Sequence, residues 1–255
     1  MSTAPTHYGA VATSVTSNLA TPERVLAIGA HPDDVEFGCG ATLAKWAAAG
    51  CTVNYLICTD GSKGTWDPQQ DTAELVLTRQ HEQRTAAKTV GSTGEVVFLG
   101  WPDGELDSGL RQRWQVAYWI RQFRPDVVIG HDPWKRYRLH PDHRHAGFLT
   151  VDAVVAARDP LFFPEQNLPH HRPATLLLFE ADEVDHVEDV TGFAAPKVAA
   201  LLCHESQHRS TMDISSSDSD QQRSAFDARI RAHLAEHGAL GAFAEGEAFK
   251  AIRDV

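Results

Sequence analysis

The chain has few cysteines and no long hydrophobic run, and each shortage excludes a class of protein. None of its four cysteines pairs with another in a Cys-x-x-Cys motif, so a disulfide-rich scaffold is excluded and buried thiols in a reducing compartment are expected. No apolar run approaches the ~18 residues that span a bilayer, and residues 1–20 lack the basic start and apolar stretch of a leader peptide. We therefore expect a cytoplasmic protein without a membrane partner.

Basic residues are also scarce. The 23 lysines and arginines are outnumbered by 34 acidic residues, and the formal net charge is −11. An acidic surface disfavours a broad contact with a phosphate backbone, so no nucleic-acid partner is expected. The sequence has no Gly-x-Gly-x-x-Gly motif either. Residues 29–34 read Gly-Ala-His-Pro-Asp-Asp, which puts two carboxylates where a dinucleotide phosphate needs bare glycine N–H groups. A nucleotide-binding oxidoreductase is thereby disfavoured.

What the chain does have is an alternation of short β-type runs and helical stretches. Hydrophobic residues make up 42% of the 255 residues, enough for one large core. Alternating strands and helices imply right-handed crossovers and a parallel sheet. We predict an α/β fold, a Rossmann-like, mostly parallel sheet with helices on both faces, as a single domain over residues 21–255 after a flexible arm over residues 1–20. The predicted strands are 25–28, 53–58, 96–99, 127–129 and 176–179, and the predicted helices are 39–49, 72–90, 110–123, 143–157, 194–204 and 221–237.

Two polar motifs follow the first and fourth predicted strands. Residues 31–34 read His-Pro-Asp-Asp, and residues 140–143 read His-Pro-Asp-His. In the common strand order 3-2-1-4-5 these two strands are neighbours, and ligands bind beyond the carboxyl ends of such strands. The sequence therefore predicts that the two motifs meet at one crevice, although they lie over a hundred residues apart.

The residue types in these motifs favour a hydrolytic metal site. A catalytic zinc ion keeps about three protein ligands and one open position for water, and His31, Asp34 and His143 fit that count. His31 and Asp34 are three residues apart, so on a helical turn they share one face while Asp33 points elsewhere. Asp33 is then free to act as a general base toward the attacking water. Because His and Asp also bind iron and other divalent ions, Fe²⁺ is an alternative to Zn²⁺.

The second motif adds two candidate catalytic residues. His140, if protonated, can stabilise the oxyanion or protonate the departing amine, and Asp142 lies nearby in sequence to hold that charge. Simpler interpretations stay open at this point. Asp34 can be an ordinary helix N-cap, and the two histidines of the motif can be surface or satisfied core residues.

The sequence resembles the PIG-L/LmbE-like de-N-acetylases. The resemblance rests on residues 30–36, Ala-His-Pro-Asp-Asp-Val-Glu, and on the later His-Pro-Asp-His. It extends over residues 25–207. The family implies a Rossmann-like sheet, a catalytic zinc ion and hydrolysis of an N-acetyl group on a glucosamine unit within a small molecule. Supporting stretches are residues 58–61, 79–82, 98–104 and 197–207.

Carried over by position, the resemblance places zinc on His31, Asp34 and His143, the general base on Asp33 and the transition-state histidine on His140. It also implies that Arg79 and Asp103 hold sugar or aglycone hydroxyls and that His204 lies near the site. The alternative for Arg79 is a solvated helix charge.

The loop over residues 131–139 departs from the small residues that are frequent at this place in the family. It carries an aromatic and basic patch, which would face an acidic or aromatic part of the substrate or else form an ordinary solvated loop. Tyr137, in this loop, is a further candidate for reaching the oxyanion.

Together these observations predict a zinc-dependent hydrolase that removes an N-acetyl group from a glucosamine-containing small molecule. Two alternatives remain open. One is an amidase that cleaves a larger acyl group from a glucosaminyl thiol conjugate, and the other is a non-catalytic metal- or nucleotide-binding Rossmann-like protein. The sequence does not decide the sugar conjugate, the role of residues 215–255, or whether the chain forms a homo-oligomer.

Overall fold

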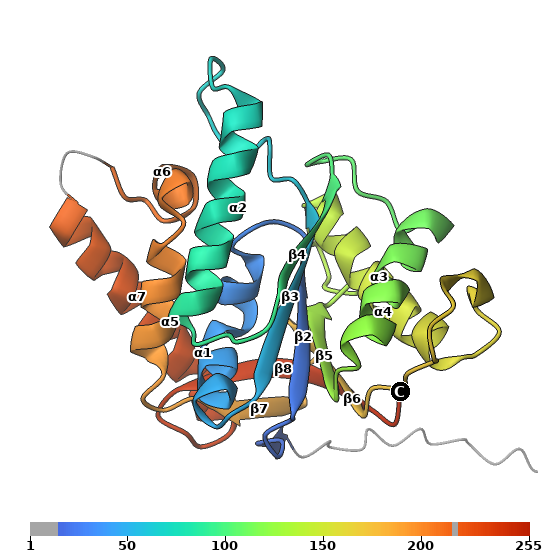
Figure 1. The fold of residues 1–255 in the computed structure, drawn as a ribbon. Coiled ribbons are helices and arrows are strands. Elements are labelled where there is room, and N and C mark those ends of the chain that lie inside the picture. Colours follow the sequence, from blue (N-terminus) through green and yellow to red (C-terminus); the bar gives the residue numbers. More distant parts are fainter. Residues whose placement is uncertain (1–14, 216–218) are drawn as a thin grey trace, which may run out of the picture.

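The computed structural model describes residues 15–215 and 219–255, which form a layered α/β fold around one eight-stranded sheet (Figure 1). The strand order is β1-β7-β8-β6-β5-β2-β3-β4. The strands are β1 (Thr16–Ser17), β2 (Arg24–Gly29), β3 (Thr52–Thr59), β4 (Val96–Trp101), β5 (Val127–His131), β6 (Thr175–Phe179), β7 (His186–Asp189) and β8 (Gly246–Arg253). The helices are α1 (Asp34–Ala48), α2 (Thr72–Thr89), α3 (Leu110–Phe123), α4 (Pro141–Arg158), α5 (Ala194–Leu202), α6 (His208–Thr211) and α7 (Ser219–Leu240), with short 3₁₀ helices at Pro164–Gln166 and Glu205–Gln207.

The five central strands confirm the predicted parallel sheet and its order. β4, β3, β2, β5 and β6 lie side by side, each parallel to its neighbour. In the register, Ala27 of β2 lies opposite Tyr55 on one side and Ile129 on the other. The loops that follow β2 and β5 therefore leave the sheet at the same edge, next to each other.

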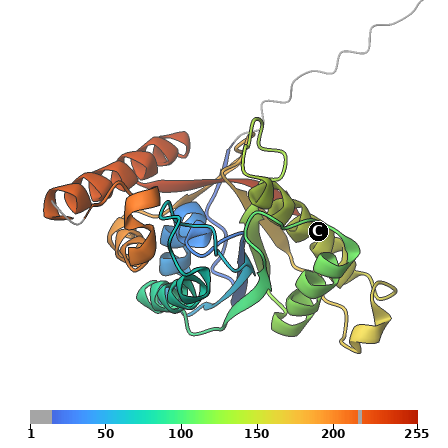
Figure 2. The same cartoon turned by 90° about the horizontal axis from the view of Figure 1, so that it is seen from above.

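Each face of this sheet is covered by its own layer of helices, as its sequence pattern requires. Successive side chains of a strand point to opposite faces. Val25 and Ala27 of β2 accordingly join the core under α1 and α2, whereas Leu26 and Ile28 join the core under α3 and α4. Figure 2 shows the two groups of helices on opposite sides of the sheet. Both faces are hydrophobic, which is why the strands are continuous apolar runs.

The sheet continues beyond the predicted strands. β8 lies between β6 and β7 and is antiparallel to both. The sequence predicted no strand after residue 179, so this strand was missed. Within β8, Ala248 and Phe249 are buried, and the strand is covered on both faces, so it lacks the alternation that would have marked it.

The predicted arm over residues 1–20 is tested only in part, because residues 1–14 lie outside the described residues. From Thr16 onward the chain is attached to the sheet. Thr16–Ser17 forms β1, parallel to β7, and Thr16 Oγ1 lies 2.9 Å from His186 Nδ1. Leu19 N–H donates to Glu188 Oε1 at 2.7 Å. Long-range partners of this kind cannot be recognised from a Ser-, Thr- and Ala-rich composition.

Helix α1 is interrupted, and a buried ion pair makes hydrogen bonds to the backbone groups at the interruption. At Cys39 the backbone leaves helical geometry, with φ −149° and ψ 19°. The N–H groups of residues 41–42 donate to the carboxylate of Glu247 at 3.1 and 2.7 Å. Lys197 Nζ donates to Phe37 O at 2.7 Å and to Glu247 Oε1 at 2.6 Å. The pair from α5 and β8 thus supplies hydrogen bonds that the broken helix cannot make internally.

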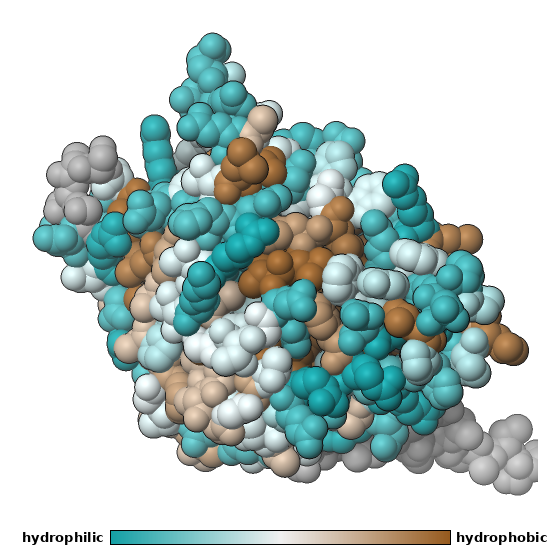
Figure 3. All heavy atoms as spheres, viewed as in Figure 1, coloured by the Kyte–Doolittle hydropathy of each residue, from teal (hydrophilic) through white to brown (hydrophobic). Residues whose placement is uncertain are grey.

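No helix within the described residues combines the length and hydropathy needed to cross a bilayer. Figure 3 shows a largely hydrophilic surface on the face seen in Figure 1, with a hydrophobic group near its middle. Exposed large side chains include Trp66 and Leu77 near α2.

Candidate metal centre

The two polar motifs meet where the sequence predicted, at the carboxyl ends of β2 and β5. His31 and Asp34 come from the turn after β2, and His143 from the first turn of α4. His31 Nδ1 lies 3.2 Å from His143 Nε2, His143 Nε2 lies 3.2 Å from Asp34 Oδ1, and His31 Nδ1 lies 3.4 Å from Asp34 Oδ2. Three potential ligand atoms therefore surround one point.

This spacing fits a bound metal ion. Donors placed tetrahedrally at about 2.0–2.1 Å from a metal lie about 3.3–3.4 Å from one another. The two ring nitrogens lie at that separation from each other, and each lies at a similar distance from one of the two Asp34 carboxylate oxygens. His31 and Asp34 are buried. Such a set can hold a divalent metal, and its chemistry suits Zn²⁺ as well as iron.

The first two ligands are held in place by further hydrogen bonds. His31 Nε2 lies 3.0 Å from Asp142 Oδ2 and 3.3 Å from Asp103 Oδ1, which leaves Nδ1 directed at the other two ligands. Asp34 Oδ2 accepts the N–H of His31 at 2.7 Å. A carboxylate behind a metal-binding histidine fixes its tautomer and ring orientation.

The Asp34 contacts also decide between the two interpretations of this residue. α1 begins at Asp34, five residues before the predicted start, and the N-cap position belongs to Asp33, whose side chain makes no capping hydrogen bond. Asp34 Oδ2 bonds to the chain before the helix, at His31, and to the His131 ring. Its carboxylate is therefore directed into the His cluster and away from the first helical N–H groups.

Asp33 is held beside this cluster in an unusual backbone conformation. Its φ of 100° lies in the left-handed region, which side-chain-bearing residues rarely adopt. Gln83 Oε1 accepts the Asp33 N–H at 2.9 Å, and Arg79 Nη2 donates to Pro32 O at 2.6 Å. Burial raises the pKa of the Asp33 carboxyl to about 6, and the Arg79 guanidinium, 3.6 Å away, opposes that rise. At neutral pH a carboxyl with this pKa is still mostly ionised and can accept a proton.

His140 lies against the two histidine ligands, but Asp142 does not serve it as expected. The His140 ring is stacked on His143 with centroids 4.8 Å apart and is edge-on to His31 at 4.6 Å. Asp142, fully buried, contacts His31 and accepts the N–H groups of Gly104 and Leu106. Burial and the neighbouring rings lower the pKa of His140. Asp142 acts on His140 only through its charge, which opposes this lowering of the pKa, while its hydrogen bond goes to His31. The imidazolium at His140 stays a prediction.

Of the four residues predicted to bind substrate, two line the pocket and two do not. Asp103 and Arg79 line the pocket at the cluster, but both already have protein partners. Arg79 donates hydrogen bonds to the carbonyls of Pro32 and Gly61. Asp103 accepts the Lys63 N–H and lies 3.3 Å from His31 Nε2. The interpretation of Arg79 as a solvated charge was wrong, since only 3% of its surface is exposed.

Tyr137 and His204 lie outside the pocket lining formed by the described residues. Tyr137 is 89% exposed on the loop before α4, and its predicted reach toward the oxyanion stays a prediction. His204 is fully buried, and its Nε2 lies 3.4 Å from Glu36 Oε2. His204 nevertheless lies near the site, because its charge and that of Asp33 act on each other's pKa.

Sequence reasoning missed two residues that support the ligands. His131, the last residue of β5, is stacked on His143 at 4.5 Å, and its Nε2 lies 3.2 Å from Asp34 Oδ2. Burial opposes its protonated form, but the Asp34 carboxylate raises the pKa of His131 above its usual value. The strand-end rule that selected the other residues also applies to His131. Arg138 is the second: its Nη1 lies 2.7 Å from His143 Nδ1, and its Nη2 pairs with Glu180.

The cluster opens into a large pocket of about 780 Å³. The three candidate ligand residues, Asp33 and His140 line this pocket, and α7 contributes Arg229, Ile230 and His233 to the lining. This volume lies within the ~300–1,000 Å³ that is typical of small-molecule sites. The arrangement places a metal-binding set, a carboxyl group and an imidazole together on the floor of one open pocket.

Comparisons with known proteins agree with this geometry. The chain is 36% identical over 188 residues to a diacetylchitobiose deacetylase of Thermococcus kodakarensis, covering 72% of this chain and 70% of that protein. It is 35% identical over 172 residues to a 1D-myo-inositol 2-acetamido-2-deoxy-alpha-D-glucopyranoside deacetylase of Streptomyces avermitilis, covering 57% of this chain and 58% of that protein.

A solved structure shares nearly the whole fold. The N,N'-diacetylchitobiose deacetylase of Pyrococcus horikoshii superposes with a TM-score of 0.81 at 28% identity, covering 91% of this chain and 84% of that one. The family model of PIG-L, described as GlcNAc-PI de-N-acetylase, matches residues 26–154, which include both polar motifs. This chain therefore belongs to the PIG-L family.

Proposed function

We propose that the protein is a zinc-dependent hydrolase that removes the acetyl group from the nitrogen of a glucosamine-containing small molecule. The observation that carries the proposal is the convergence of His31, Asp34 and His143 at the floor of a pocket that also holds Asp33. Relatives named as deacetylases of N-acetylglucosamine compounds support the choice of an amide substrate.

The reaction would place the acetamido group over the three ligand residues. His31, Asp34 and His143 would hold a divalent metal there, which would supply Lewis acidity toward the acyl carbonyl and the attacking water. Asp33 accepts a proton from the attacking water while the oxygen of that water adds to the carbonyl carbon. When the C–N bond breaks, the same proton passes to the departing nitrogen, and acetate and a free amine are released.

His140 is assigned a supporting role in this reaction. Its ring lies edge-on to His31 and lines the same pocket. A neutral imidazole retains one N–H donor, which can stabilise the developing oxyanion. Asp142 acts through His31, whose ring it orients, and is therefore a positioning residue.

The test is acetate release from a panel of N-acetylglucosamine derivatives by chelator-treated, zinc-loaded and iron(II)-loaded protein. We expect release that depends on the added metal. N-acylated glucosamines with longer acyl chains belong in the same panel, because the pocket volume does not by itself limit the acyl group. Cleavage of longer acyl groups alone would replace the deacetylase with an amidase, and silence on every amide despite one bound metal would overturn the proposal.

A further inference from the structure

The backbone of Asp33 is held by a side chain from another helix. Its φ of 100° and ψ of −27° lie where residues with a side chain are rarely found, and such a conformation persists only when surrounding contacts impose it. The Asp33 N–H donates to Oε1 of Gln83, a residue of α2, at 2.9 Å. Both residues are buried. Gln83 therefore makes a contact that can impose the conformation of Asp33.

A second buried side chain decides which end of the Gln83 amide faces Asp33. A glutamine amide has an oxygen that accepts and a nitrogen that donates, and only the oxygen can bind the Asp33 N–H. At the other end, Gln83 Nε2 donates to Glu36 Oε1 at 2.7 Å. Because a carboxylate offers only acceptors, Glu36 binds the nitrogen and leaves the oxygen directed at Asp33. Gln83 and Glu36 are both 0% exposed, so bulk water does not compete for these bonds.

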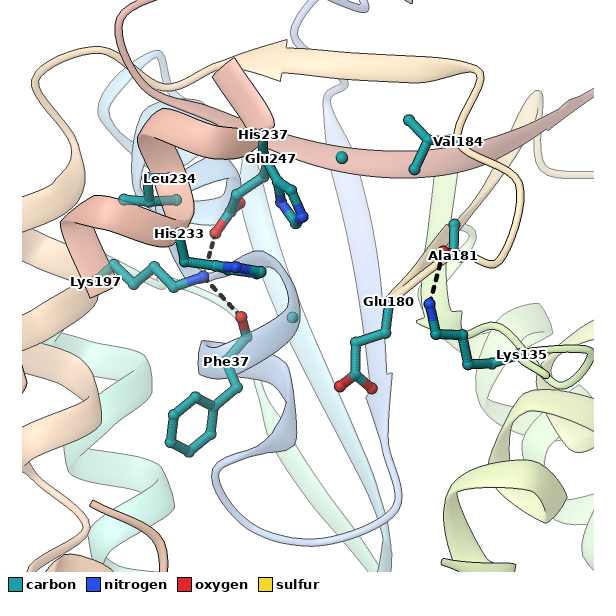
Figure 4. Close-up of a pocket in the computed structure, with 12 residues that line it drawn as sticks. Phe37, Lys135, Glu180, Ala181, Val184, Lys197, His233, Leu234, His237 and Glu247 are labelled. Carbon is teal, nitrogen blue, oxygen red and sulfur yellow. Dashed lines mark hydrogen bonds and ion pairs between the residues drawn. The ribbon is translucent and has the colours of Figure 1, made fainter. Parts of the chain in front are cut away.

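Glu36 is itself fixed by contacts at the start of α1. Its Oε2 lies 3.4 Å from Nε2 of His204, which is fully buried just after α5. In the same turn, the Phe37 N–H donates to Asp33 O at 3.1 Å, and Lys197 Nζ donates to Phe37 O at 2.7 Å. Figure 4 shows the ammonium group of Lys197 directed at this carbonyl oxygen. The turn that carries Asp33 and Glu36 is thus held between α2 and α5.

The Gln83–Glu36 pair contacts Asp33 without reaching the pocket. Asp33 is among the described residues that line the pocket, whereas Gln83 and Glu36 are not. The candidate ligand Asp34, next in the chain, has a separate contact, because its Oδ2 accepts the His31 N–H at 2.7 Å. The pair can therefore act on a substrate only through Asp33.

We propose that Gln83 and Glu36 are positioning residues that keep the Asp33 carboxyl group in the pocket, where it accepts a proton from the attacking water. The inference rests on the proposed function for the role of that carboxyl group, but the backbone conformation that it explains does not. Without the Gln83 acceptor, Asp33 relaxes to a negative φ, and its carboxyl group leaves the place from which it takes the proton. Metal and substrate binding do not use these bonds, so the loss falls on kcat.

The first test exchanges the two side chains. In Gln83→Glu two carboxylates face each other and neither can donate, so we expect kcat to fall about 100-fold with KM within about twofold of wild type. Addition of Glu36→Gln restores the bonds in reverse, because the new amide at position 36 donates to the new carboxylate at position 83, which still accepts the Asp33 N–H. The double variant should recover kcat to within about fivefold of wild type. A double variant no more active than Gln83→Glu alone would overturn the proposal.

The second test separates positioning from stability and introduces no buried charge. Gln83→Met keeps a similar volume and removes both bonds. The matched control is Gln166→Met, because Gln166 is also buried, accepts from Arg121 Nη1 at 2.9 Å and donates to Trp114 O at 2.8 Å. Urea unfolding should show similar losses for the two variants, but only Gln83→Met should lower kcat, by about tenfold or more. Its metal content should stay at the wild-type value.

Three results of this second test would contradict the positioning role. They are a wild-type kcat in Gln83→Met, an equal fall of kcat in Gln166→Met, and loss of the metal from Gln83→Met. The first would show that the bond to Asp33 is not needed. The second would trace the loss to lower stability, and the third would trace it to the ligands.

The third test needs no turnover. Crystal structures of the wild type and of Gln83→Met compare the backbone at Asp33. We expect a φ near 100° in the wild type and a negative φ in the variant, and the same φ in both proteins would overturn the proposal. If the expected change occurs but the wild type releases no acetate from any amide of the panel, the proposed function is rejected and the positioning of Asp33 by Gln83 stands.

Discussion

Two buried clusters of charged side chains in this protein are built in opposite ways. In the Lys197–Glu247 pair, the carboxylate accepts three hydrogen bonds and the ammonium donates to the carboxylate and to a carbonyl. At the metal centre, His31, Asp34 and His143 instead bring lone-pair-bearing atoms to within 3.2–3.4 Å of one another. In one cluster, protein partners supply these hydrogen bonds, and the other is arranged so that it could hold a metal ion.

The difference separates a structural use of buried charge from a chemical one. The ion pair supplies hydrogen bonds to a broken helix, and its side chains are only about 2% exposed. The metal cluster lies at the floor of an open pocket, and its outer hydrogen bonds orient the ligands without filling the space between them. Burial and charge are shared by both clusters, so the discriminating feature is where the donor and acceptor atoms point.

The largest expected effect follows from removing a ligand. Asp34→Ala takes away a carboxylate that faces two histidine rings, so metal binding and activity should be lost together, with kcat/KM falling by about 10³-fold or more. Metal content by atomic emission and acetate release measure the two effects. Addition of Zn²⁺ should raise the Tm of wild type and leave that of Asp34→Ala unchanged. A variant that retains one tightly bound metal would remove Asp34 from the ligand set.

The next effect separates chemistry from metal binding at the neighbouring residue. Asp33→Asn keeps the size of the side chain but cannot accept the proton of water, so kcat should fall by about 10²–10⁴-fold. Metal content should stay at the wild-type value. Loss of the metal together with activity would show that Asp33 supports the ligands, and unchanged kcat would exclude it as the base.

Breaking the Lys197–Glu247 ion pair should lower the free energy of unfolding without preventing metal binding. Lys197→Met leaves the Glu247 carboxylate buried without its cation, which typically costs about 3–5 kcal/mol. Urea unfolding measures the free energy of unfolding, and Zn²⁺ binding by the folded variant should be retained. Arg231→Met is the control: it breaks a partly exposed pair with Asp227 and should cost less than about 1 kcal/mol. Equal losses in the two variants would contradict the structural role of Lys197–Glu247.

The smallest effect is expected at the exposed loop. Tyr137 is 89% exposed, so Tyr137→Phe should change the free energy of unfolding by less than about 0.5 kcal/mol. Acetate release should remain within about twofold of wild type, because a side chain outside the pocket makes no transition-state contact. A large loss of kcat would restore the sequence-based role of this hydroxyl group.

The sequence predicts the part of the molecule that depends on local pattern. Apolar runs of three to six residues located β2 to β6, and the rule that ligands bind beyond strand ends brought His31 and His143 together. That rule was sufficient because parallel neighbours send their following loops to the same edge of the sheet.

The contacts that were not predicted are made between residues that lie far apart in the sequence. The expected partner of Asp142 was His140, two residues away, but its carboxylate contacts His31 across the crevice. The role of Gln83 on the Asp33 backbone likewise joins residues 50 positions apart. β8 was not predicted, because its hydrophobic pattern depends on its position between β6 and β7. The sequence does not reveal that position.

The position of β8 links the last strand of the chain to one cavity and leaves the centre of the sheet independent of it. β7 follows β6 in the chain, yet it joins the sheet through β8, which comes later. The strands that precede the candidate ligands, β2 and β5, pair with each other directly. Glu247 and Ala248 of β8, in contrast, form part of the wall of the cavity that His237 of α7 also lines (Figure 4). Changes in β8 can therefore reshape this cavity without altering the pairing of β2 with β5.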